Sequence, residues 1–317
     1  MNNINEKLDG KTILITGGTG SFGRMMLNTL LKESVHEIRI LSRHEDLQVQ
    51  MKREVQDERV KFFLGDVRDY ERCLEVTKGV DIVFHAAALK HISEIERHPM
   101  EAVKTNILGT WNLKKSCIEN NVNHVVGIST DKAVKPINVY GMTKAIDERI
   151  LLNRETEFAT NFSVVRYGNV IGSRGSVIPY WYSLAKNHQD LPITDEGMTR
   201  FWITLDEAIK LVLFALKNPF MICVKNFKAF ALIDLARIYK EEFSVREKII
   251  GIRAGEKIHE CLLTDYEMRK SKLDNGYYKV DLNSKDVTRN VSDFSSDKAE
   301  KIGYEEMKTL LKKEGLL

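Results

Sequence analysis

The sequence lacks most features that identify secreted, membrane or metal-binding proteins. Only four cysteines occur in 317 residues, with no Cys-x-x-Cys pair and no histidine at metal-ligand spacing. Scattered cysteines are typical of reduced thiols in the cytosol, so we expect neither disulfides nor a metal site. No apolar run approaches the roughly 18 residues of a membrane helix. Residues 1–7 are polar and carry no signal-peptide pattern, which predicts a cytoplasmic protein.

Charge of one sign is also missing. The chain has 48 Lys and Arg against 45 Asp and Glu, a net charge of +3. Nucleic-acid binding would require a clustered basic excess, so we expect no nucleic-acid partner. With 43% hydrophobic and 29% charged residues, the composition is that of an ordinary globular protein and excludes a disordered chain.

Short β-rich runs alternate with helix-sized stretches through the first half of the chain. The runs are residues 12–16, 37–41, 60–64, 81–85, 124–128 and 162–166. This alternation predicts an α/β fold, a Rossmann-type doubly wound parallel sheet with crossover helices on both faces.

The alternation of strands and helices ends after Arg166, and residues 168–179 contain several glycines and a proline. We expect a smaller, interleaved α/β lobe that binds the substrate. The predicted division is a cofactor-binding domain at 1–167 and a lobe at 168–317, with a strand near 221–224 returning to the first sheet.

A glycine-rich loop follows the first predicted strand. Gly17, Gly18, Gly20 and Gly23 fit both G-x-G-x-x-G and G-x-x-G-x-x-G. Glycines here permit a tight turn and let the backbone approach a pyrophosphate at a helix N-terminus. The loop predicts a dinucleotide site contacted by Gly17, Thr19, Gly20, Ser21, Phe22 and Gly23.

The end of the second predicted strand indicates which nicotinamide cofactor is used. An NAD site usually has Asp or Glu about 20 residues after the glycine loop. This chain has Ser42 and Arg43, which suit a 2′-phosphate and predict NADP, although Arg43 stacked on adenine would leave NAD open. Asp66 and Val67 are placed to meet the adenine, and the small Ala86 leaves room for the cofactor.

Tyr140 and Lys144 form a Tyr-x-x-x-Lys pair, which a helix places on one face. An ammonium beside the phenol, helped by the cationic nicotinamide, is expected to lower the phenol pKa, so that Tyr140 can take a proton from a sugar hydroxyl. Ser129 and Thr130, at the end of the fifth predicted strand, supply the accompanying hydroxyl.

Asp131 and Lys132 follow directly, at a strand end where open α/β sheets bind ligands. An epimerase or reductase needs only the Tyr and Lys. The added pair indicates loss of a proton next to a carbonyl and loss of a hydroxyl. Burial and the nearby Lys144 are expected to lower the pKa of Lys132 and make it a neutral base. The alternative is a salt-bridged turn.

Seven motifs in order resemble the soluble, inverting UDP-N-acetylglucosamine 4,6-dehydratases of the extended short-chain dehydrogenase/reductase superfamily. The resemblance covers about residues 10 to 265. The motifs are Thr16-Gly-Gly-Thr-Gly-Ser-Phe-Gly23, His85-Ala-Ala-Ala-Leu-Lys-His91, Ser129-Thr-Asp-Lys-Ala-Val134, Val165-Arg-Tyr-Gly-Asn-Val170, Gly172-Ser-Arg-Gly-Ser-Val177, Met198-Thr-Arg-Phe201 and Gly255-Glu-Lys-Ile-His-Glu260.

The resemblance implies a redox-neutral lyase that makes a sugar precursor for bacterial surface or flagellar glycans. Tyr140 would deprotonate the 4-hydroxyl, Lys132 would take the C5 proton, and Asp131 would protonate the departing 6-hydroxyl. Tyr140, where configuration-retaining relatives tend to carry Met, favours inversion at C5. The resemblance also implies dimers or hexamers.

Further contacts are implied by the resemblance alone. Lys90, Ser129, Tyr140, Lys144 and Val170 would also contact the cofactor. The implied UDP-sugar contacts are Lys90, Asn169, Arg174, Gly175, Ser176, Val177, Arg200, Arg253 and Glu256.

Two other functions remain open at this point. A UDP-sugar 4-epimerase on the same fold would move hydride out and back at C4 without Asp131 or Lys132. A non-catalytic NADP-binding sensor would bind cofactor and leave UDP-sugar unchanged, although such proteins tend to lose the Tyr-x-x-x-Lys pair kept here.

Overall fold

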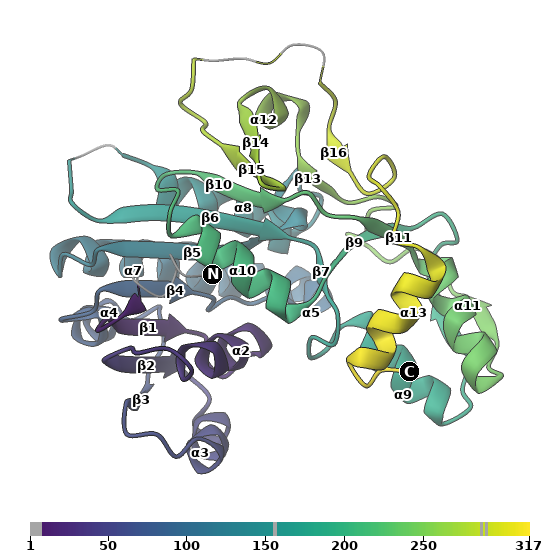
Figure 1. Ribbon diagram of the computed structural model, residues 1–317, viewed down its shortest axis with the longest axis horizontal. Helices are drawn as coiled ribbons and strands as arrows, with labels where there is room; N and C mark the ends of the chain where they lie inside the picture. Colours follow the sequence, from purple (N-terminus) through teal and green to yellow (C-terminus); the bar gives the residue numbers. More distant parts are fainter. Residues whose placement is uncertain (1–7, 155–156, 286–287, 289–290) are drawn as a thin grey trace.

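The computed structural model describes residues 8–154, 157–285, 288 and 291–317. Residues 1–7, on which the prediction of no signal peptide rests, lie outside the described residues. A sheet of nine strands forms the centre of the described molecule, in the order β14-β15-β10-β6-β5-β4-β1-β2-β3 (Figure 1). Its strands are β1 (Thr12–Thr16), β2 (Glu37–Ser42), β3 (Val60–Leu64), β4 (Ile82–His85), β5 (His124–Thr130), β6 (Asn161–Tyr167), β10 (Ile222–Lys225), β14 (Ser271–Asp274) and β15 (Tyr277–Val280).

The strands from β3 to β10 run parallel, as predicted for a Rossmann-type sheet. All five residues of β1 are buried, because helices cover both faces of the sheet. Strand β10 comes from the second half of the chain and lies beside β6. The sheet order reverses between β1 and β4, which opens a crevice at the carboxyl ends of these strands.

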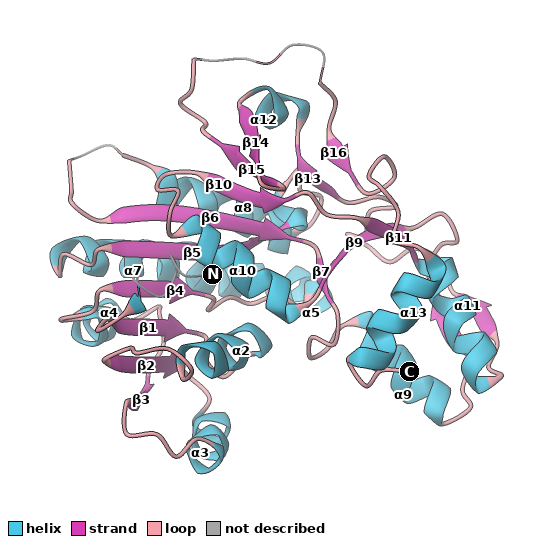
Figure 2. Cartoon of the chain, viewed as in Figure 1, coloured by secondary structure: helices cyan, strands magenta, loops and turns pink. Residues whose placement is uncertain are grey.

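Helices cover the two faces of the sheet (Figure 2). On one face α2 contacts α10, and on the other α7 lies between α4 and α8. The helices of this part are α2 (Ser21–Leu30), α3 (Glu45–Glu54), α4 (Tyr70–Thr77), α5 (Ile92–Arg97), α6 (Pro99–Ala102), the π-helical segment η1 (Val103–Leu108), α7 (Gly109–Glu119), the 3-10 turn η2 (Asp131–Ala133), α8 (Val139–Leu152) and α10 (Leu205–Ala215).

A second hydrophobic cluster, with Trp181, Trp202 and Tyr239 among its members, forms the core of the smaller lobe. The C-terminal helix α13 packs on α11 in this lobe (Figure 1). The lobe's elements and the short strands that join it to the sheet are β7 (Asn169–Val170), α9 (Val177–Lys186), β8 (Leu191–Ile193), β9 (Thr199–Ile203), β11 (Ala229–Ala231), α11 (Leu232–Phe243), β12 (Glu247–Ile249), β13 (Cys261–Leu263), β16 (Phe294–Ser295) and α13 (Tyr304–Lys313). The short helix α12 (Asp265–Arg269) lies instead at the large sheet, where its Glu267 pairs with Arg166 of β6.

The antiparallel hairpin β14–β15 extends the sheet at one edge and was not predicted. Its turn contains Asn275 and Gly276, both with positive φ (49° and 81°). An Asn-Gly pair between β-rich runs is a strong hairpin signal, so the sequence held this information.

Candidate active site

The glycine-rich loop connects β1 to α2, and the structure leaves no room for a side chain at Gly17 or Gly23. A Cβ on Gly17, whose φ is 65°, would lie 2.8 Å from the Ala87 amide nitrogen. A Cβ on Gly23 would lie 2.3 Å from the Gly18 carbonyl oxygen. Among the described residues, no side chain caps the N-terminus of α2, whose N-cap is Gly20. The loop therefore presents free amide groups and a helix dipole to an anion, and a dinucleotide pyrophosphate fits it.

A cleft of about 620 Å³ lies above this loop and is lined by residues from both halves of the chain. It brings together every residue predicted to contact the cofactor. It also brings in four of the five predicted catalytic residues, the exception being Asp131. The predicted residues that line it are Gly17, Thr19, Gly20, Ser21, Phe22, Gly23, Ser42, Arg43, Asp66, Val67, Ala86, Lys90, Ser129, Thr130, Lys132, Tyr140, Lys144, Asn169, Val170, Arg174, Gly175 and Ser176.

Arg43 lies at the end of the cleft where the ribose of a dinucleotide is expected. Its guanidinium is 3.8 Å from the Asp66 carboxylate, which is held more closely by Arg68 at 2.8 Å. The Arg43 side chain is 38% exposed. A guanidinium paired this loosely is available to a further anion at the cleft.

The loop after β4 is fixed by Asn106, which the sequence did not reveal. The Asn106 side chain accepts a hydrogen bond from the Leu89 amide (2.8 Å) and donates to the Leu89 carbonyl and to Thr143 on α8 (3.0 Å each). Asn106 belongs to η1, and π-helical segments often occur at functional sites. Its amide thereby holds Lys90 in position at the cleft wall.

Lys90 and Arg174 meet across the cleft. The Lys90 ammonium donates to the Arg174 carbonyl (3.2 Å), and the Arg174 amide donates to the Ser21 hydroxyl (3.1 Å). Burial, with a smaller contribution from the Arg174 charge, lowers the pKa of Lys90. These contacts connect the lobe to the glycine-rich loop through the Arg174 backbone, at a wall of the cleft that carries two cationic residues.

Asp131 and Lys132 form the turn η2 directly after β5. The Asp131 side chain is fully buried, and its Oδ1 accepts hydrogen bonds from the Thr130 hydroxyl (2.9 Å) and the Lys132 ammonium (3.0 Å). Within the described residues, Asp131 Oδ2 has no hydrogen-bond donor. A Cβ on Gly168, a residue of the cleft wall, would lie 3.2 Å from this oxygen. Burial raises the pKa of Asp131 and outweighs the opposing charge of Lys132, and the Glu260 charge adds to the upward shift.

Tyr140 and Lys144 lie one turn apart on α8, which begins where Asn138 accepts a hydrogen bond from the Gly141 amide (2.7 Å). The Lys144 ammonium forms an ion pair with Asp147 on the same helix. Burial raises the pKa of the Tyr140 phenol and outweighs the lowering effect of the Lys144 and Lys132 charges. The protein groups by themselves therefore do not lower the phenol pKa, and the predicted lowering with a bound cationic nicotinamide stays a prediction.

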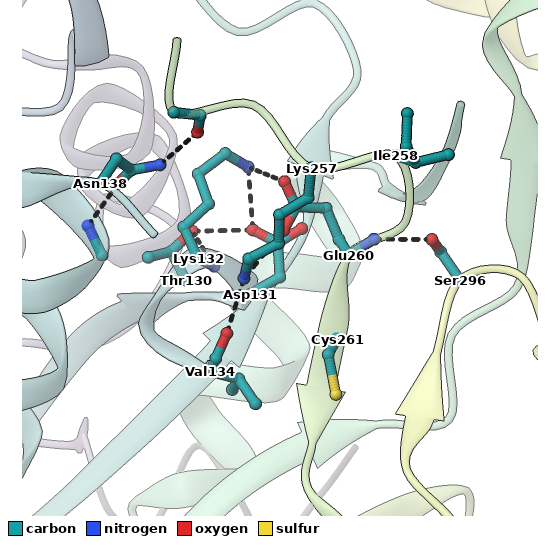
Figure 3. Close-up of polar contacts among 12 residues, drawn as sticks. Thr130, Asp131, Lys132, Val134, Asn138, Lys257, Ile258, Glu260, Cys261 and Ser296 are labelled. Carbon is teal, nitrogen blue, oxygen red and sulfur yellow. Dashed lines mark hydrogen bonds and ion pairs between the residues drawn. The ribbon is translucent and has the colours of Figure 1, made fainter. Parts of the chain in front are cut away.

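The predicted lowering of the Lys132 pKa is wrong. Burial does lower the pKa of Lys132, but the Asp131 and Glu260 carboxylates outweigh it and the net shift is upward. Lys132 lies between these carboxylates, with Glu260 Oε1 3.5 Å from its ammonium (Figure 3). Glu260 is the last residue of the motif at 255–260, but its proximity to Lys132 is visible only in the fold.

Four predicted substrate residues lie outside the cleft lining. Arg200 is buried, and its guanidinium donates to the carbonyls of residues 199, 257 and 258, so it braces a loop instead of facing the cleft. Arg253 is 60% exposed and lies 3.8 Å from Glu256. Val177 begins α9 just beyond the lining residue Ser176.

No group of three or more His, Cys, Asp or Glu side chains suited to a metal ion occurs among the residues that the structure describes. All four cysteines are free and buried. In the same described residues, every helix is too short or too polar to cross a membrane.

Comparisons with known proteins show the family to which the chain belongs. The model of the family described as "Polysaccharide biosynthesis protein" matches residues 13–281. The chain is 42% identical to a UDP-N-acetylglucosamine 4,6-dehydratase (inverting) from Campylobacter jejuni subsp. jejuni serotype O:23/36 (strain 81-176), over 90% of this chain and 87% of that protein. It is 40% identical to a UDP-glucose 4-epimerase from Rickettsia bellii (strain RML369-C), over 95% of each chain.

The crystal structure of Pen from Bacillus thuringiensis is also similar, with a TM-score of 0.93 and 34% identity over 98% of this chain and 99% of that one. The segment that the family model matches, residues 13–281, includes the glycine-rich loop, the Asp131–Lys132 pair and the Tyr140–Lys144 pair. The chain therefore belongs to the polysaccharide-biosynthesis family of nucleotide-sugar 4,6-dehydratases and 4-epimerases, enzymes with a Rossmann-type fold.

Proposed function

We propose that the chain catalyses NADP-dependent 4,6-dehydration of UDP-N-acetylglucosamine with inversion at C5. The product would be UDP-2-acetamido-2,6-dideoxy-β-L-arabino-hex-4-ulose. The observation that carries the proposal is the buried Asp131 carboxyl, whose Oδ1 is 3.0 Å from the ammonium of Lys132, a residue that lines the nucleotide cleft. Dehydration needs an acid for the departing 6-hydroxyl and a base at C5, whereas 4-epimerisation needs neither.

The residues at the glycine-rich loop fit a dinucleotide, and Arg43 favours a 2′-phosphate. The amides at the start of α2 would hold the pyrophosphate, while the Arg43 guanidinium would meet the phosphate on the ribose. Hydride transfer out of C4 and back to C6 is the chemistry that bound NADP supplies.

The side chains at the cleft divide the proton transfers among them. Tyr140 takes the proton of the 4-hydroxyl, and the Lys144 and Lys132 charges stabilise its phenolate. The resulting 4-keto group acidifies the C5 proton. Lys132, once it has lost its own proton, takes the C5 proton. Asp131, whose pKa is raised by burial, gives its proton to the 6-hydroxyl, which leaves as water.

Lys90 and Arg174 would bind the diphosphate of the nucleotide sugar through their positive charges. Both line the cleft, and their contact connects the lobe to the loop after β4. The choice of UDP-N-acetylglucosamine as the substrate is supported by a relative that is named UDP-N-acetylglucosamine 4,6-dehydratase (inverting) and is 42% identical to this chain.

UDP-glucose 4-epimerisation is the second candidate, because a relative at 40% identity carries that name. Mass spectrometry of the nucleotide sugar separates the two reactions. The protein is incubated separately with UDP-N-acetylglucosamine and with UDP-glucose. The proposal predicts that the first substrate loses one water. Unchanged mass, together with conversion to the C4 epimer seen in the proton NMR spectrum, would contradict it and establish the epimerase.

A further inference from the structure

Glu260 is a buried carboxylate next to the predicted catalytic residues. The residue directly precedes β13, and its side chain is 3% exposed. The Glu260 amide donates to the Ser296 hydroxyl (2.9 Å), and the Glu260 carbonyl accepts from the Ser296 amide (2.8 Å). These backbone contacts fix the residue, and its side chain points at Lys132 (Figure 3).

The Lys132 ammonium lies between two carboxyl groups. It is 3.0 Å from Asp131 Oδ1 and 3.5 Å from Glu260 Oε1. In the described part of the chain, neither Asp131 Oδ2 nor Glu260 Oε2 has a hydrogen-bond donor, although both atoms are buried. Each carboxyl group therefore keeps an oxygen that is able to carry a proton.

Different charges face the two carboxyl groups. Glu260 faces Lys132 from η2, Arg200 from β9 and Lys257, whose ammonium is 3.6 Å from Oε2. Burial raises the pKa of Glu260, but these three cations outweigh it and the net shift is downward. Asp131, for which burial is the largest effect, has a raised pKa.

The proposed dehydration requires Asp131 to be the acid. Lys132, close to two carboxyl groups, then starts as an ammonium, and Glu260, which also faces Lys257, starts as a carboxylate. An ammonium has no lone pair, so Lys132 must lose a proton before it can remove another from C5. Glu260 Oε1 is the nearest ionised oxygen in that arrangement.

We propose that Glu260 accepts this proton and so converts Lys132 into the amine base, an inference that rests on the proposed 4,6-dehydration. One proton moves from the Lys132 ammonium to the Glu260 carboxylate. The amine then takes the C5 proton, and Asp131 gives its proton to the hydroxyl that leaves C6 as water. The step ends with an Asp131 carboxylate, a Lys132 ammonium and a protonated Glu260, which balances protons and charge.

Glu260→Gln tests the proposal, because an amide of the same shape cannot accept the proton. With UDP-N-acetylglucosamine in heavy water, we expect deuterium uptake at C5 and dehydration to fall about 100-fold. Oxidation at C4, followed by the absorbance of the reduced nicotinamide, should persist, as should binding of NADP. Glu75→Gln on α4, an exposed glutamate, is the control and should match the wild type.

The pH dependence separates proton transfer from a structural role. In Glu260→Gln, solvent base must take the proton from Lys132, so the residual dehydration should rise with pH. Glu260→Asp keeps a carboxylate, so its rate of dehydration should be about 10-fold higher than that of Glu260→Gln. Wild-type C5 exchange in Glu260→Gln, or equal losses of C4 oxidation and C5 exchange, would overturn the inference.

The wild type serves as the reference for the proposed function. A wild-type protein that leaves UDP-N-acetylglucosamine undehydrated would overturn the proposed function and this inference with it. A wild type that dehydrates, together with an unaffected Glu260→Gln variant, would overturn the inference alone.

Discussion

Two buried charge clusters in this protein differ in how completely their hydrogen bonds are made. Arg166 lies between Glu148 and Glu267, and every one of its guanidinium N–H groups has an acceptor in these carboxylates or the Leu262 carbonyl. The Asp131–Lys132–Glu260 cluster is equally buried at its carboxyl groups. Across the described residues, however, it leaves one oxygen of each carboxyl without a donor.

The difference indicates different roles. A buried ion pair whose hydrogen bonds are all made fixes the packing of its elements, here β6, α8 and α12, and has no unused acceptor for chemistry. A buried cluster with unused acceptors lowers the free energy of unfolding, and such clusters are typical of functional sites. Variants of the Arg166 cluster should therefore mainly reduce stability, whereas variants of the Asp131–Lys132–Glu260 cluster should mainly reduce the rate of dehydration.

The largest expected effect comes from Asp131→Asn. Because an amide has no proton to donate to the departing hydroxyl, we expect dehydration to fall about 1,000-fold, within the range known for general acids. Oxidation at C4 should continue, and the melting temperature should not fall, since an incompletely paired buried carboxyl is removed. Stopped-flow absorbance and product analysis measure the two steps. Dehydration within a few-fold of wild type would show that Asp131 is not the acid.

Arg166→Met should affect stability instead. Without the guanidinium, Glu148 and Glu267 remain buried and unpaired, which costs about 3–5 kcal/mol of unfolding free energy. Urea denaturation measures this loss. Any variant protein that remains folded should retain the ratio of C4 oxidation to dehydration. A loss below about 1 kcal/mol would mean that the cluster does not hold the fold.

Glu267→Gln should have a smaller effect that depends on pH. Burial raises the pKa of Glu267, but Arg166 outweighs it and the net pKa lies below the ordinary 4.5. A lowered carboxyl pKa contributes stability above 4.5 that is lost as the pH falls through the folded-state value. We expect the variant to lose about 1–3 kcal/mol at neutral pH, and less as the pH falls below 4. Urea denaturation at several pH values tests this, and a constant difference would contradict it.

The smallest effect is expected for Arg43→Ala, at a charge that is neither buried nor firmly paired. Loss of the guanidinium should weaken NADP binding about 10-fold, equivalent to about 1.4 kcal/mol, and leave NAD binding nearly unchanged. Fluorescence titration with both cofactors measures the ratio. Equal weakening of the two would mean that Arg43 does not contact the 2′-phosphate.

The part of the site that the sequence predicts well is built from neighbours in the chain. Gly17, Gly20 and Gly23 are constrained by the turn between β1 and α2, and Tyr140 and Lys144 by one helical turn. The same local order gives the parallel strands within one or two residues of their predicted bounds.

The part that could not be predicted depends on contacts between distant segments. Lys132 and Arg200 each carry a positive charge in the sequence, but only the fold shows that Lys132 lies between two carboxylates and that backbone carbonyls surround Arg200. The direction of the Lys132 pKa shift was predicted wrongly because the Asp131 and Glu260 charges together outweigh burial, and the sequence does not show that Glu260, far along the chain, lies beside Lys132. The same limit applies to Asn106, whose side chain holds a loop from another strand.

The most direct measurement is a proton NMR spectrum of the wild-type reaction with UDP-N-acetylglucosamine in heavy water. Dehydration through Asp131 and Lys132 predicts a new C6 methyl signal, deuterium at C5 and couplings of the arabino configuration. A galacto-configured product with no methyl signal would contradict it and assign the same cleft to 4-epimerisation. An unchanged spectrum from a protein that binds NADP would contradict it as well, and would indicate a cofactor-binding sensor.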